Sequence, residues 1–255
     1  MSAEFYVGYQ PQAPRGVARH VRAAVLIAGV FAVAVGALLA TLHRRLPLST
    51  FEFGQDQTEF TGVLISDPYP VLRVRRPGAQ LESTEAWSRY LLVAPGKFGA
   101  QALARGFDGA TVRLRGTLVY QDERTMIEVV ADSIEQLDPQ PVAEDSGALS
   151  LGQHTLVGEI VDSKCQMGVM NPGERKTHRA CATLCIEGGI PPLLLVREAS
   201  GEVQRFLLVS ADGRAVNSDV LDMVAVPVRI TGEVWRADDL YILRADPATY
   251  ERLRD

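Results

Sequence analysis

The chain has 255 residues, of which 47% are hydrophobic and 22% are charged, with 22 glycines and 14 prolines. This composition excludes a disordered, collagen-like or fibrous protein, and the length suffices for two domains of about 100–150 residues. The 26 Lys and Arg residues against 31 Asp and Glu residues give a formal net charge of −5, which argues against a nucleic-acid partner.

An uncharged apolar run of twenty residues occupies positions 23–42. At about 1.5 Å per residue, a helix of this length spans roughly 30 Å, the hydrocarbon thickness of a bilayer. A cleaved signal peptide has a shorter apolar core that lies closer to the N-terminus. The run therefore predicts a retained, single-pass transmembrane helix.

The orientation of this helix follows from the arginines at its two ends. Arg15, Arg19 and Arg22 precede the run, whereas Arg44 and Arg45 follow it. Because positive charge is retained inside, the excess of one arginine favours a cytoplasmic N-terminus. We predict a bacterial inner-membrane protein with a cytoplasmic tail at 1–22 and periplasmic C-terminal domains.

One face of the predicted helix carries only small side chains, at every fourth position: Ala24, Ala28, Ala32, Gly36 and Ala40. Small residues let two helix backbones approach closely, and in lipid such packing holds helices together. They are also simply frequent in membrane spans. The specific interpretation is a docking face for another membrane-protein subunit.

The rest of the chain contains an internal repeat. Three pairs of segments match: 60–65 with 156–161, 89–93 with 205–209, and 112–118 with 228–234. The segments alternate apolar and polar residues and contain glycines, which indicates antiparallel strands that bend. We predict a mostly β chain with two OB-like small barrels at 58–137 and 153–250, joined by a Pro-rich acidic linker at 138–152. A β-sandwich is the alternative.

The second copy is longer than the first. The first matched pair is offset by 96 positions and the other two pairs by 116, so the second copy contains 20 extra residues. All three cysteines of the chain, Cys165, Cys181 and Cys185, lie in this insertion. Because the first copy has no cysteine at the matching place, the barrel itself needs neither a cross-link nor an ion.

A helix is predicted in the second half of the insertion. Asn171–Glu174 fits a capping box with Pro172 at the first helical position, although Thr177 is an alternative start. The pair Gly188 and Gly189 predicts the end of the helix, and residues 193–196 then form a buried strand.

On this helix His178, Cys181 and Cys185 share one face, which Cys165 can meet from the preceding loop. His178 and Cys185 are separated by about 10.5 Å along the axis, too far for one ion to bind both without strain. A metal site would therefore use the three cysteines, with His178 as a fourth ligand if the first turn frays.

Four interpretations of the cysteines remain open. A disulfide between Cys165 and either Cys181 or Cys185 suits an oxidising compartment. A thiolate-rich site suits a transition metal ion such as copper, zinc or iron in an iron–sulfur centre. The third interpretation is a reactive thiol, although the sequence lacks the usual C-x-x-C motif of such thiols. The fourth is that the cysteines are structural and form no bond.

The insertion resembles a family of uncharacterised bacterial membrane-anchored extracytoplasmic domains. Their pattern, D-S-x-C followed by a His-containing stretch, C-x3-C and a Gly pair, is matched by Asp162, Ser163, Cys165, His178, Cys181, Cys185, Gly188 and Gly189. The layout is also similar to the haem chaperones of cytochrome c maturation. Neither His154 nor His178 stands in their H-x-x-x-Y motif, so the resemblance does not imply haem binding.

The sequence contains no nucleotide-binding loop, zinc-protease helix or nucleophile elbow. We therefore expect a non-enzymatic accessory or assembly subunit of a membrane complex. The alternative is a metal-binding or redox module that uses the three cysteines.

Overall fold

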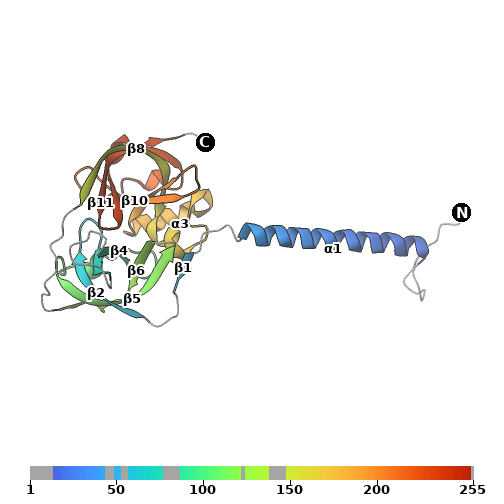
Figure 1. The fold of residues 1–255 in the computed structure, drawn as a ribbon, viewed down its shortest axis with the longest axis horizontal. Helices are drawn as coiled ribbons and strands as arrows, with labels where there is room; N and C mark the ends of the chain where they lie inside the picture. The colour runs from blue at the N-terminus through green and yellow to red at the C-terminus, as the bar shows by residue number, and fades with distance from the viewer. Residues whose placement is uncertain are drawn as a thin grey trace. The chain divides into compact units, whose positions relative to one another are not determined.

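The computed structural model describes residues 14–43, 49–52, 57–76, 87–121, 124–137 and 148–253 (Figure 1). The chain divides into two units, Met1–Pro47 and Leu48–Asp255. The first unit contains a single described helix, and the second contains two β-barrels.

Helix α1 (Arg15–His43) contains the predicted span and is long and apolar enough to cross a membrane. It begins eight residues before position 23, so the second part of the predicted tail is helical. The reason is local, because Pro14 suits a helix start and the Ala18 N–H already donates to the Pro14 carbonyl at 2.9 Å. The small side chains predicted as a docking face are exposed on α1. Residues 1–13 lie outside the described part.

The first barrel is a closed ring of five strands. They are β2 (Thr58–Ile65), β3 (Val71–Arg75), β4 (Trp87–Val93), β5 (Thr111–Gln121) and β6 (Arg124–Val129). The order round the ring is β2, β3, β4, β6, β5, and only the β4–β6 pair is parallel. Helix α2 (Gln101–Ala104) lies between β4 and β5, while β1 (Ser49–Phe51) and β7 (Glu135–Gln136) pair with β5.

The second barrel repeats this topology. Its strands are β8 (Leu149–Asp162), β9 (Pro192–Arg197), β10 (Val203–Val209), β11 (Pro227–Ala237) and β12 (Leu240–Arg244). The β10–β12 pair is parallel, and β11 closes the ring on β8. The short helices η3 (Leu221–Met223) and η4 (Pro247–Thr249) and strand β13 (Glu251–Arg252) complete it. The prediction of two tandem OB-like barrels is confirmed.

The three matched sequence pairs occupy equivalent strands in equivalent register. Gly62 in β2 lies opposite Val112, and Gly158 in β8 lies opposite Val228. A Cβ atom at either glycine would stand 2.4 Å from a carbonyl oxygen of the neighbouring strand, that of Arg73 or Leu195. Glycine is required here because the first strand of each barrel passes unusually close to the second.

Some predicted boundaries differ from the observed ones. Strand β8 begins at Leu149, inside the predicted linker 138–152, because the extended β11 offers hydrogen-bonding partners as far as Leu149. Strand β13 ends beyond residue 250, where β11 again supplies the partner. Residues 138–147 lie outside the described part.

The two barrels share a hydrophobic core. Leu91 and Met126 of the first barrel belong to the same buried cluster as Leu193 and Leu207 of the second barrel. Cys165 lies in this cluster as well. The insertion therefore packs where the two barrels meet.

Polar contacts join the faces of the two barrels formed by their second and third strands. Asp238, in the β11–β12 turn, accepts a hydrogen bond from Arg73 of β3 at 2.9 Å and from Arg89 of β4 at 2.8 Å. In the opposite direction, Arg205 of β10 donates to Gln121 at the end of β5, and also to Gln166 of its own barrel at 2.8 Å. OB folds bind oligonucleotides on the face formed by these strands, and here residues of each such face contact the other barrel.

Candidate metal centre

The insertion lies between β8 and β9, the first and second strands of the second barrel. It consists of a π-helical turn, η2 (Cys165–Val169), and helix α3 (Arg175–Glu187). The carboxylate of Asp162, the last residue of β8, accepts a hydrogen bond from the Cys165 N–H at 2.8 Å. This local contact fixes the start of η2 and explains why Asp162 stands three residues before Cys165.

The start of α3 differs from both predicted starts. Glu174 has an extended backbone, and the helix begins at Arg175 without a side-chain cap from Asn171. The carboxylate of Glu159 in β8 accepts the hydrogen bond of the Arg175 N–H, while the Glu174 carboxylate pairs with Arg197 at 2.9 Å. The capping-box prediction is wrong because a residue distant in sequence provides the cap. The predicted end at Gly188 and the following strand are confirmed.

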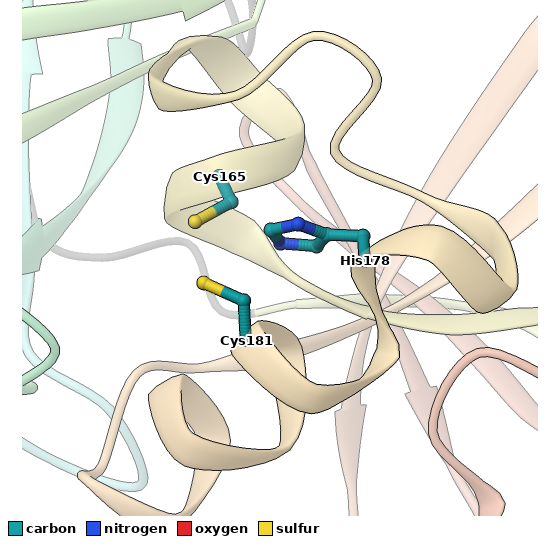
Figure 2. Close-up of side chains that lie close together, drawn as sticks. All are labelled: Cys165, His178 and Cys181. Atoms are coloured by element: carbon teal, nitrogen blue, oxygen red, sulfur yellow. The ribbon is translucent and has the colours of Figure 1, made fainter.

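The cysteines and His178 converge in two overlapping groups. In the first group, the sulfur atoms of Cys165 and Cys181 and a ring nitrogen of His178 all lie within 4.8 Å of one another. Figure 2 shows the two sulfur atoms facing each other, with the imidazole ring beside them. In the second group, a carboxylate oxygen of Asp162 and the sulfur atoms of Cys165 and Cys185 meet the same limit. Cys165 belongs to both groups.

His178 joins the cluster although α3 is intact at this point. It does so beside Cys165 and Cys181 only, because Cys165 approaches the helix from η2 on the side of His178. The expectation that His178 needs a frayed first turn to be a fourth ligand with all three cysteines stays a prediction. The expected separation of His178 from Cys185 agrees with the structure, since no group that could hold a metal ion, among those formed by the described residues, contains both.

The histidine is held by a carboxylate. Its Nε2 atom lies 3.1 Å from Oδ2 of Asp162, and both side chains are buried. Histidines that bind metal ions usually donate their other ring N–H to a carboxylate, which fixes the tautomer and the orientation of the ring. Asp162 thus positions both Cys165 and His178, a role that the sequence did not predict for it.

The sulfur atoms of Cys165 and Cys185 lie within 4.8 Å of each other. The interaction of the two thiols, together with burial, raises the pKa of Cys165. The same interaction lowers the pKa of Cys185. All three cysteines are free thiols in the structure, so the predicted disulfide of Cys165 with Cys181 or Cys185 is not formed. An S–S bond would bring two of these sulfur atoms to roughly 2 Å of each other.

Access to the cluster is one-sided. Cys165, Cys185 and His178 are 4%, 2% and 4% exposed, whereas Cys181 is only partly buried. A ligand or an ion therefore reaches the cluster at Cys181. Of the two methionines near Cys165, Met167 packs in the shared core and Met170 is exposed.

The first barrel contacts the cluster at its partly exposed residue, Cys181. The ammonium group of Lys97, in the loop after β4, lies 2.9 Å from the Cys181 sulfur. The loop is fixed to the end of α3, since the Gly99 N–H donates to the Gly188 carbonyl at 3.0 Å. A buried lysine of the insertion, Lys164, donates in return to the carbonyl oxygens of Ala94 and Gly96 and pairs with Glu128. Sequence reasoning found neither lysine, because each acts on the other barrel.

Substituting Gly188 with alanine tests this attachment. The added Cβ would stand 1.9 Å from the Lys97 carbonyl oxygen, so the loop must move away from α3. We expect Gly188→Ala to lower the free energy of unfolding by about 1–3 kcal/mol, the usual cost of overpacking. Urea unfolding followed by circular dichroism measures this loss. Gly201→Ala is a poor control because of its positive φ. Ser200→Ala, in the same exposed turn, removes only an exposed hydrogen bond from the Glu202 N–H and should change stability by less than about 0.5 kcal/mol.

The donor set fits a soft metal ion. Three atoms at most 4.8 Å apart have a common centre within about 2.8 Å of each, so a shift of at most about half an ångström brings them to the roughly 2.3 Å of a zinc–sulfur bond. Thiolate and imidazole ligands select Cu(I) and Zn²⁺ over hard cations.

Comparisons with known proteins identify no family. No protein-family model and no curated protein matches the sequence. Two solved structures with some similarity are both of the single-stranded DNA binding protein from Thermus aquaticus. The wild-type protein is 15% identical over 79% of this chain and 94% of that chain, with a TM-score of 0.24. A deletion mutant is 14% identical over 82% and 96%, with a TM-score of 0.24.

Proposed function

We propose that the chain is a membrane-anchored, non-enzymatic metal-binding accessory subunit of a membrane complex. Helix α1 holds it in the bacterial inner membrane, and the two barrels present a site for Cu(I) or Zn²⁺ on the periplasmic side. The observation that carries this proposal is the convergence of Cys165, Cys181 and His178 within 4.8 Å of one another, with Cys185 beside Cys165.

Three features support a metal site over the other interpretations of the cysteines. A disulfide needs two sulfurs, and a nucleophilic cysteine needs one sulfur and a base. Here two sulfurs and an imidazole meet in one group, and the third sulfur lies in a second group that shares Cys165. The His178–Asp162 pair matches the carboxylate–histidine arrangement of metal centres. The fixed position of η2 and α3 between two barrels supplies the rigid support that such a centre needs.

The decisive experiment is the metal content of the full chain, purified from its native membrane in an uncharged detergent. We expect about one equivalent of copper or zinc per chain, as a single site of this ligand set would hold. Thiol titration should show the cysteines protected until the metal is removed by a chelator. Less than about a tenth of an equivalent after reconstitution with either ion, with all thiols reduced, would contradict the proposal.

Asp162 offers a milder test of the same site. Asparagine at this position keeps an oxygen acceptor for the Cys165 N–H but weakens the contact that orients His178. We expect Asp162→Asn to reduce the metal affinity by about 10–100-fold while the binding stoichiometry is unchanged. Competition with a chelator of known affinity measures the change, and Asp212→Asn, which alters an exposed ion pair, is the matched control. Equal metal affinities of the Asp162→Asn and Asp212→Asn variants would contradict a role of Asp162 in the metal site.

A further inference from the structure

Lys97 stands at the only partly exposed ligand of the cluster. Its ammonium group is exposed, and it donates a hydrogen bond to the Cys181 sulfur. An exposed lysine is a cation over the physiological pH range, because its ordinary pKa is about 10.4. Any carrier that brings an ion to Cys181 therefore meets a positive charge before it meets the sulfur.

Exposed apolar side chains lie next to Lys97 and Cys181. Phe98 follows Lys97 in the same loop and is 62% exposed, and Leu184, three residues after Cys181 on α3, is 54% exposed. The loop and the helix meet here, because a Cβ atom on Gly188 would stand 1.9 Å from the Lys97 carbonyl oxygen and 3.3 Å from that of Leu184. We name these three residues (Lys97, Phe98 and Leu184) the exchange face. Glu187 is the exposed carboxylate at the end of α3.

Lys97 places a positive charge on this face, although the formal net charge of the whole chain is −5. A positive charge next to the entry sulfur repels a hydrated metal cation and attracts a complex whose total charge is negative. An apolar rim round a charged centre is typical of protein contact surfaces.

We propose that the exchange face receives the ion from an anionic carrier, a complex in which acidic or thiolate groups hold a soft metal ion, and that Lys97 is the positioning residue that draws the carrier to Cys181. This inference rests on the proposed metal-binding function. The transfer involves no change of oxidation state. One bond from the ion to the carrier breaks as the bond to Cys181 forms, and the thiol proton passes to the departing donor or to water.

The experiment compares carriers of opposite charge. Cu(I) is supplied to the full chain, reduced, metal-free and in uncharged detergent, as its negatively charged complex with bathocuproine disulfonate or its positively charged complex with neocuproine. Stopped-flow absorbance follows the loss of each complex. We expect Lys97→Met to slow uptake from the negatively charged complex on the order of threefold at low salt and not to slow uptake from the positively charged one. Raising the ionic strength from about 0.01 to 1 M should remove the difference.

Two further variants complete the test. Lys97→Arg keeps the charge and should restore uptake from the anionic complex. Arg229→Met removes the charge of Arg229 on β11, which forms an exposed ion pair with Glu251 of β13. This variant should leave the rates of uptake from both complexes unchanged. Equal slowing with both complexes would mean that Lys97 only supports the fold and would overturn the inference, as would no effect at all. Failure of the unsubstituted chain to take up Cu(I) or Zn²⁺ from either source would instead refute the proposed function itself.

Discussion

Replacing Cys165 with serine should reduce the affinity for Cu(I) or Zn²⁺ more than any other single substitution at the site. Its sulfur is the only atom that belongs to both groups of potential ligands. The loss should exceed the roughly 10–100-fold that follows from changing a residue outside the ligand shell. Chelator competition at fixed pH measures the affinity, with Cys181→Ser and Cys185→Ser for comparison.

The matched control for this substitution is Met170→Leu. Met170 is the nearest exposed thioether in the chain segment after η2, at 45% exposure, and leucine has a similar volume. We expect its metal affinity to equal that of the unsubstituted chain. An affinity for Cys165→Ser within threefold of this control would contradict the assignment of Cys165 as a ligand. Circular dichroism of both metal-free variants separates a lost ligand from a lost fold.

The second large expected effect is on stability and concerns the buried ion pairs between the two barrels. Asp238→Ala should lower the free energy of unfolding by about 3–5 kcal/mol, because it leaves the buried guanidinium groups of Arg73 and Arg89 without their shared carboxylate. Their side chains are 4% and 10% exposed, and that of Asp238 is 3% exposed. Urea unfolding measures the loss. Asp212→Ala, which breaks the exposed pair with Arg214, should change stability by less than about 1 kcal/mol.

The contacts of Asp238 with Arg73 and Arg89 also predict that the stability of the fold depends on pH. Burial raises the pKa of Asp238, but the hydrogen bonds from Arg73 and Arg89 outweigh it, so the pKa is lowered overall. The carboxylate therefore stabilises the fold above its unfolded-state pKa of about 3.9, and this contribution is lost as the pH falls through the lower folded-state value. The stability difference between the unsubstituted chain and Asp238→Asn should be constant near neutral pH and shrink below about pH 4. A stability difference that grows below about pH 4 would contradict the lowered folded-state pKa of Asp238.

The fold was predictable from the sequence to the extent that its signals are local or repeated. Gly62 and Gly158 recur because both barrels need the same close approach of strands, and the offsets between matched segments located the insertion. The start of α3 was not predictable, because its cap is Glu159 on another element. The early start of α1 was missed because hydropathy marks the apolar part of a helix and not its polar first turns.

The candidate site divides in the same way. The spacing of Cys181 and Cys185 on one helix face, and the position of Cys165 before it, predicted their meeting. The role of Asp162 was not predictable, because it depends on His178, which is sixteen residues away and approaches only when η2 folds back. Lys97 carried no signal at all, since 84 residues separate it from Cys181.

The contribution of the first barrel has a practical consequence for protein engineering. The insertion contains every sulfur atom, so transplanting it into an unrelated host barrel would transfer all of the thiols. The host would lack the carbonyl oxygens of Ala94 and Gly96 that hold Lys164, and the ammonium group of Lys97 beside Cys181. The smallest unit that could be transferred with the complete centre is therefore both barrels together, because the cysteine-free first barrel provides part of the surroundings of the insertion.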